Sequence, residues 1–147
     1  MQKLSLAQIL ERDNTQILEI FTPSENILFS NEVLNFVTDN FKLKSRNKDL
    51  ITDVECATRQ MIANAIEHGN KSDSSKKIKV YCSWVGKGFY FVVQDEGKGF
   101  DVENPPAGDP EYGGLGLHYT KKMMDLVYNF NDSAVYLCKK RKGFFCF

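Results

Sequence analysis

One carboxylate stands where a strand-like run of the chain ends. Phe91-Val92-Val93-Gln94 is rich in aromatic and β-branched residues, which is typical of a buried strand, and Asp95 follows at once. Gly97 and Gly99 come next, so the backbone can turn where a side chain would collide with a bound group. This spacing fits a carboxylate at the floor of a cavity, and an ordinary exit from strand to loop would have the same spacing.

An asparagine and a histidine lie one helical turn apart in the segment Asn64-Ala65-Ile66-Glu67-His68-Gly69. Asparagine disfavours a helix interior because its side chain competes for backbone hydrogen bonds. Asn64 is therefore either a buried amide with satisfied hydrogen bonds or an amide oxygen aimed at a hard cation such as Mg²⁺. A histidine at the position of His68 is more often a packed, hydrogen-bonded residue than a catalyst.

The glycine-rich run Gly113-Gly114-Leu115-Gly116 opens an expected helix. Glycines at a helix N-terminus expose backbone N–H groups, and the helix dipole favours phosphate there. The alternative is a flexible hinge. The sequence has neither the usual dinucleotide-binding order nor the Gly-Lys-Ser/Thr of a P-loop.

The elements that must position these groups follow from periodicity and turn residues. The second long helix has an apolar stripe at three- and four-residue steps, formed by Leu50, Ile51, Val54, Ala57, Thr58, Met61, Ile62 and Ala65. We expect a short helix or loose arm in the first dozen residues, a strand at 15–21, a helix at 25–41 capped by Ser24, a helix at 49–69 capped by Asp49, a hairpin of strands at 77–84 and 89–95, a long loop at 100–112, a helix at 114–127, and a closing hairpin at 128–130 and 134–140.

Length and charge narrow the class of protein. The 147 residues fit one domain over 1–147, with a core at about 16–140, and 42% of them are hydrophobic. Basic and acidic residues number 19 each, so no net field favours nucleic acid or an anionic membrane. The four cysteines form no CxxC pair, so we expect free thiols, no zinc site and a cytoplasmic protein. The aromatic tail of Phe144, Phe145 and Phe147 is expected to pack on the domain or at a subunit interface.

The three motifs, in this order and spacing, resemble the GHKL superfamily of ATP-binding domains. Asn64 matches its N box, the run Asp95-Glu96-Gly97-Lys98-Gly99-Phe100 its G1 box, and Gly113-Gly114-Leu115-Gly116-Leu117 its G2 box. The flanks of these boxes look like bacterial anti-sigma factors with serine-kinase activity, from about Gln16 to Lys140.

The resemblance implies an α/β (α+β) two-layer sandwich, with a mixed, mostly antiparallel sheet covered on one face by helices. It also implies ATP or ADP with Mg²⁺ as cofactors. In that family Asp95 would accept a hydrogen bond from the adenine amino group, Asn64 would coordinate Mg²⁺, and residues 100–112 would form a lid. The other residues that it assigns to the nucleotide are His68, Gly97, Gly99, Phe100, Gly113, Gly114, Leu115, Gly116 and Leu117.

One position departs from the family pattern. The general base of the family is a glutamate one turn before the N-box asparagine, where this chain has Gln60. An amide cannot take a proton from a hydroxyl or a water, so phosphotransfer is in question while binding is not. At 100° per residue, Asp53, Gln60, Asn64 and Glu67 share one flank of the helix. Glu67 is the weaker alternative base, since it lies a turn beyond Asn64.

Two classes of function follow from the resemblance. In the first, the chain is a regulator that holds a sigma factor or similar client and is released by an anti-anti-sigma (STAS-type) partner, which it phosphorylates on Ser/Thr if it retains kinase activity. In the second, less favoured, it is a catalytic module of the histidine-kinase type. A third possibility, which Gln60 keeps open, is a nucleotide sensor without phosphotransfer. The expected partners are proteins, with no direct nucleic acid or membrane, and a homodimer is compatible with both classes.

Overall fold

The computed structural model describes residues 1–23, 31–97, 101–103, 115–130 and 134–142. Their strands form one sheet in the order β1-β2-β3-β5-β4. The bounds are β1 Gln16–Phe21, β2 Lys77–Val85, β3 Gly88–Gln94, β4 Leu126–Tyr128 and β5 Ala134–Lys140. All four described pairings are antiparallel. The predicted α+β sandwich is confirmed, and its described strands are more uniformly antiparallel than expected.

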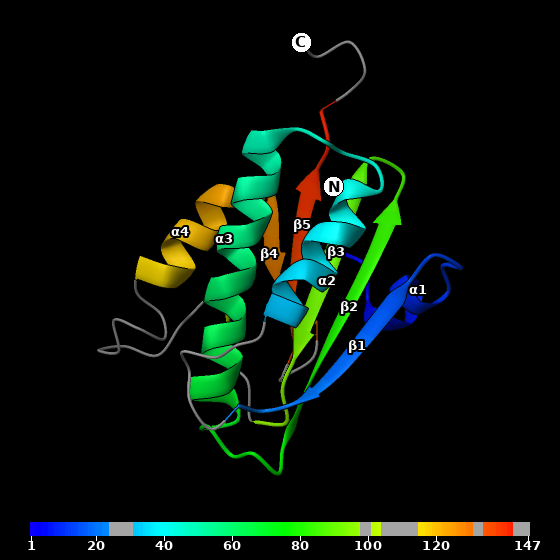
Figure 1. Ribbon diagram of the computed structural model, residues 1–147. Coiled ribbons are helices and arrows are strands. Elements are labelled where there is room, and N and C mark those ends of the chain that lie inside the picture. The colour runs from blue at the N-terminus through cyan, green and yellow to red at the C-terminus, as the bar shows by residue number, and fades with distance from the viewer. Residues whose placement is uncertain (24–30, 98–100, 104–114, 131–133, 143–147) are drawn as a thin grey trace.

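Three helices cover one face of this sheet, and Figure 1 shows two of them in front of it. They are α2 Asn31–Lys42, α3 Lys48–Asn64 and α4 Leu115–Met123. A row of apolar side chains on that face crosses four strands in register: Leu18, Val80, Val93 and Val135. The predicted stripe of α3 packs on this face, with every member buried except the half-buried Ile51.

The opposite face of the sheet carries a second, smaller core. Leu4 and Ile9 are buried there against Tyr81, Tyr90, Tyr128 and Tyr136. Ile9 belongs to the short helix α1 Leu6–Leu10, which begins with a capping box between Ser5 and Gln8. The first residues are therefore a packed helix and not a loose arm.

Several predicted boundaries need correction. Helix α3 is capped by Asn47, whose Oδ1 accepts from Leu50 N at 3.0 Å, and not by Asp49. The last helix stops at Met123, and Val127 lies in β4, where it pairs with Leu137. The β2–β3 hairpin is confirmed, with a turn at Gly86, whose φ is +61°.

The regular α-helix also ends earlier than expected after Asn64. Residues Ala65–Gly69 form a π-helical turn, labelled η2, in which Asn70 N donates to Ala65 O at 2.8 Å. Single π turns inside helices insert one extra residue and often occur at functional sites. None of the helices in the described ranges has the length and apolarity needed to cross a membrane.

Candidate functional site

The candidate site lies where the end of α3 meets the end of β3. Asn64 is the last residue of α3 and is 7% exposed. Its Nδ2 is buried and has no hydrogen-bond partner among the residues that the structure describes. A buried polar side chain without a protein partner is unusual, and its amide is available to a bound group. The Oδ1 and Nδ2 of an amide are interchangeable in shape, so either atom can face that ligand.

Asp95 follows β3 directly, and its carboxylate packs on the backbone of the π turn. A Cβ at Gly69 would lie 2.1 Å from Asp95 Oδ2, so glycine leaves the carboxylate room in its present position. Gly97 N donates to Asp95 Oδ1 at 2.8 Å. Burial raises the pKa of the Asp95 carboxyl above its ordinary value, and the Gly97 hydrogen bond only partly opposes this.

Gly97 is also required by close packing. A Cβ there would lie 2.0 Å from Gly69 O, which is a backbone atom that cannot rotate away. The turn after β3 and the end of the π turn therefore touch backbone to backbone. This contact brings Asp95 to the end of the molecule where α3 passes into the π turn after Asn64.

Other predicted site residues are placed in part. Gln60 is exposed on α3, one turn before Asn64, and Asp53 pairs with the buried Lys139 at 3.1 Å. Glu67 and His68 are half-buried in the π turn, with His68 Nε2 3.9 Å from Glu67 Oε2. Leu117 is a buried residue of α4, and Leu115 and Gly116 at the start of that helix have helical backbone.

The remaining predicted positions lie outside the described residues. They are the cap Ser24, the glycines and aromatic Gly99, Phe100, Gly113 and Gly114, most of the lid at 100–112, and the aromatic tail with Phe144, Phe145 and Phe147. Of the lid, residues 101–103 are described. There Val102 is buried, its N–H donates to Asn129 Oδ1 at 2.7 Å, and its carbonyl accepts from Lys121 Nζ at 2.6 Å. This segment is thus tied to α4 and to the residue after β4.

The residues present fit a Mg²⁺ ion that would have only one protein ligand. In the ranges described, no three His, Cys, Asp or Glu side chains gather into a group that could hold a metal ion. A magnesium ion held through phosphates, waters and one protein oxygen needs no such group. Asn64, buried and short of a hydrogen-bond partner, can supply that oxygen.

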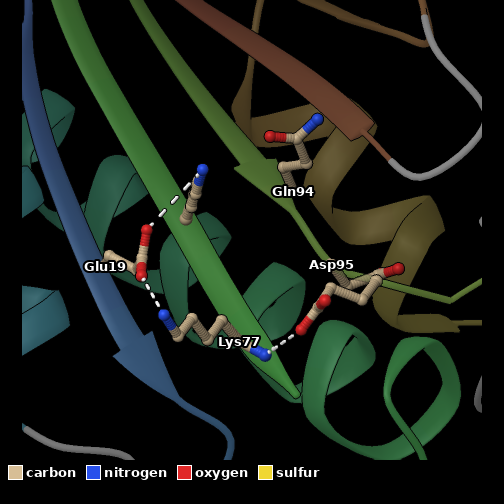
Figure 2. A pocket seen from close by; sticks show the side chains of 6 residues that line it. Glu19, Lys77, Gln94 and Asp95 are labelled. Carbon is tan, nitrogen blue, oxygen red and sulfur yellow. Dashed lines mark hydrogen bonds and ion pairs between the residues drawn. The ribbon is translucent and has the colours of Figure 1, made fainter.

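A cavity of about 400 Å³ opens on the other face of the sheet and reaches the candidate site at Asp95. Its lining is Glu19, Lys77, Lys79, Gln94, Asp95 and Glu96. Figure 2 shows Glu19 and Lys77 on the near side of the sheet and Asp95 beyond the end of β3. Glu19 pairs with Lys77 at 2.9 Å and with Lys79 at 3.6 Å, so this cavity's positive charge is largely compensated. It is a poor match for a phosphate site.

Sequence reasoning missed Asn70, which is fully buried beside the π turn. Its Oδ1 accepts from Glu96 N at 2.8 Å, in the turn that follows Asp95. The only signal in the sequence was an asparagine directly after a helix-ending glycine, which is also typical of an ordinary turn.

Comparisons with known proteins agree with this geometry. Residues 30–138 match the model of the histidine kinase-like ATPase domain. The chain is 30% identical over 98 residues to the serine-protein kinase RsbW of Bacillus licheniformis, which covers 59% of this chain and 61% of that protein. It is 30% identical over 142 residues to the anti-sigma F factor of Clostridium perfringens, in two strains, which covers 88% of this chain and 97% of that protein. The chain therefore spans less than two thirds of the kinase and nearly all of the anti-sigma F factor.

Proposed function

Since the chain belongs to the bacterial anti-sigma factor and serine-protein kinase family of histidine kinase-like ATPase domains, we propose that it binds ATP with Mg²⁺ and that the nucleotide controls its hold on a protein client. The client is a sigma factor or a protein of similar role. An anti-anti-sigma partner of the STAS type binds this chain and thereby releases the client. A homodimer is compatible with this scheme.

The observation that carries the proposal is the half-buried carboxylate of Asp95 on the backbone of Gly69. An ionised carboxylate accepts a hydrogen bond from the 6-amino group of adenine. A 6-oxo purine such as guanine would place an acceptor against that acceptor, which is unfavourable in a partly buried site. The site therefore favours ATP or ADP over guanine nucleotides.

The phosphates would lie toward Asn64 and the beginning of α4. Asn64 would hold Mg²⁺, which neutralises phosphate charge when it is bound. The N-terminus of α4, whose first described residues are Leu115 and Gly116, would contribute backbone N–H groups and a favourable dipole. Packing of α4 on α3 supports this arrangement.

The metal assignment is tested by titrating ATP with and without Mg²⁺ into the parent chain and into Asn64→Ala. If Asn64 ligates the metal, the substitution weakens the binding of ATP with Mg²⁺ and has little effect on ATP with EDTA. The metal-free titration is the internal control for damage to the fold. Equal losses with and without Mg²⁺ would contradict the assignment.

A second candidate function is a nucleotide sensor without phosphotransfer, and Gln60 favours it. Gln60 is exposed one turn before Asn64, at the position of the family's base, and its amide cannot accept a proton. In this form the protein would bind ATP and its client, and the anti-anti-sigma partner would act by competition alone. The two candidates differ in whether the partner gains a phosphoryl group.

A further inference from the structure

Asn70 is the most completely bonded side chain at the candidate site. It is 0% exposed and follows the π turn directly. Its Nδ2 donates to Thr22 Oγ1 at 2.8 Å and to Lys77 O at 3.0 Å, while its Oδ1 accepts from Glu96 N at 2.8 Å. The Asn70 amide thus makes two hydrogen bonds as donor and one as acceptor, and its three partners lie on three separate segments of the chain.

Those segments are the end of β1, the start of β2 and the turn after β3. Thr22 is buried, and both its N–H and its hydroxyl donate to Lys76 O, at 2.9 and 2.8 Å. Lys77 N in turn donates to the Glu96 carboxylate. These hydrogen bonds form a closed ring that joins Asn70, Thr22, Lys77 and Glu96. In the turn after β3, Glu96 is therefore held both by its side chain and by its backbone N–H.

The direction of Asp95 depends on this ring. The carboxylate has Gly69 beneath it and accepts from Gly97 N, and both contacts require the turn to keep its place against the π turn. Glu96 lies between Asp95 and Gly97, and Glu96 N is the atom that Asn70 holds. A shift of Glu96 would therefore move both the Asp95 backbone and the N–H that orients its carboxylate.

We propose that Asn70 is a positioning residue for base recognition, which fixes the Asp95–Gly97 turn so that the carboxylate faces the 6-amino group of adenine. The proposal rests on the proposed binding of ATP. It assigns to Asn70 the selectivity for a 6-amino purine over a 6-oxo purine, without contact between Asn70 and the base. Thr22 acts in the same way through the Asn70 amide.

Base selectivity separates positioning from mere stabilisation. Inosine triphosphate differs from ATP only in carrying a 6-oxo group and a protonated N1, so the ratio of the two dissociation constants reports on Asp95. A loss of stability lowers the folded fraction of the protein and weakens the apparent binding of both nucleotides by the same factor. A displaced carboxylate lowers the preference for ATP.

The experiment measures both dissociation constants by calorimetry in Asn70→Ala and Thr22→Val. Thr58→Val is the matched control, since Thr58 is 1% exposed and its hydroxyl donates to Val54 O at 2.7 Å, away from the ring. The parent is expected to prefer ATP by about tenfold or more, the worth of one hydrogen bond to a charged group. That preference should fall to within about threefold in Asn70→Ala and Thr22→Val, and it should persist in Thr58→Val.

The combined variant Asn70→Ala/Asp95→Asn, compared with Asp95→Asn alone, shows whether Asn70 acts through Asp95. If Asn70 acts through Asp95, its substitution changes the ratio no further once the carboxylate is gone. A parent-like preference in a folded Asn70→Ala, or in Thr22→Val should Asn70→Ala fail to fold, would overturn the positioning role and leave ATP binding standing. A parent chain that does not distinguish the two nucleotides would overturn the base recognition on which both proposals depend.

Discussion

A carboxylate at the position of Asp95 is unfavourable for the fold. Burial raises the pKa of Asp95, which means that the folded protein disfavours the ionised form. Ionisable side chains whose pKa is shifted by burial lower the stability of the fold, and they are common at functional sites. For Asp95 the proposed compensation is the hydrogen bond that an ionised carboxylate can accept from a bound base.

The raised pKa predicts the pH dependence of Asp95→Asn. Because the folded-state pKa lies above the ordinary value of 3.8, the contribution of Asp95 to stability is present below that value and is lost as pH rises through the folded pKa. At neutral pH the neutral amide should therefore be the more stable, and its oxygen can still accept from Gly97 N. Thermal unfolding between pH 3 and pH 8 should show this gain shrinking as the pH falls. A variant less stable than the parent at pH 7 would contradict the assignment.

Gln60 sets the expected rate of any phosphotransfer. General-base catalysis is typically worth about 10² to 10⁴ in rate, so the parent should transfer phosphate slowly or not at all. Gln60→Glu should raise transfer from labelled ATP to an anti-anti-sigma protein of the same genome, while ATP affinity stays unchanged because Gln60 is exposed on α3. Glu67→Gln is the control. Fast transfer by the parent that Glu67→Gln abolishes would make Glu67 the base.

At the scale of single residues, the sequence predicted that Asp95 follows a buried strand, and a buried amide was one of two interpretations of Asn64. It did not predict Asn70, because its role depends on three segments far apart in the sequence. Thr22, Lys77 and Glu96 come together only when β1 and β2 pair and the turn after β3 closes on the π turn. No local sequence pattern predicts the contacts of Asn70 with these three residues.

Among the elements, the helix that carries Asn64 was predicted with its stripe but not with its end. The period of three and four residues holds along α3 because the residues of the stripe lie in the core between the helices and the sheet. Beyond Asn64 the backbone widens into the π turn, and Gly69 then packs on Asp95. A periodicity argument assumes a constant 100° per residue, which does not hold in the π turn that contains Glu67.

The contact between the π turn and Asp95 predicts a selective effect of Gly69→Ala. The new methyl group would lie 2.1 Å from Asp95 Oδ2 and 2.4 Å from Asp95 Cγ, so the carboxylate must move. ATP affinity should fall by about tenfold or more, the worth of one hydrogen bond to a charged group.

Gly86→Ala is the matched control for this substitution. Gly86 has a φ of +61° and open space around it, so alanine should cost about 1–2 kcal/mol of stability through backbone strain alone. Its ATP affinity should equal that of the parent. An unchanged affinity in Gly69→Ala would show that the carboxylate tolerates displacement, against the proposed role of the turn.

In the whole molecule, the sheet has two buried faces of unequal size. The larger face was predictable, because the alternation of apolar residues in β2 and the stripe of α3 each indicate one side of a layer. The covering of the other face by Leu4 and Ile9 was not, since a five-residue helix has too short a pattern to show which surface it meets.

This packing predicts different effects for two neighbouring residues of α1. Ile9 is 0% exposed, so Ile9→Ala should lower the free energy of unfolding by about 2–4 kcal/mol. Leu10 is 45% exposed, so Leu10→Ala should change it by no more than about 0.5 kcal/mol. Urea unfolding of both variants measures the difference. Equal and small effects would mean that the N-terminal segment contributes little to the fold.

The most direct test of the whole account is a calorimetric titration of ATP with Mg²⁺ into the parent chain and into Asp95→Asn. The account predicts that the parent binds and that the variant loses about 2 kcal/mol or more of binding free energy, because the amide places a donor against the adenine amino group. Thermal unfolding of the variant at the same pH checks that the comparison is made on folded protein. Equal affinity in the two chains would contradict adenine recognition by Asp95, and absence of binding by the parent would contradict the proposed function.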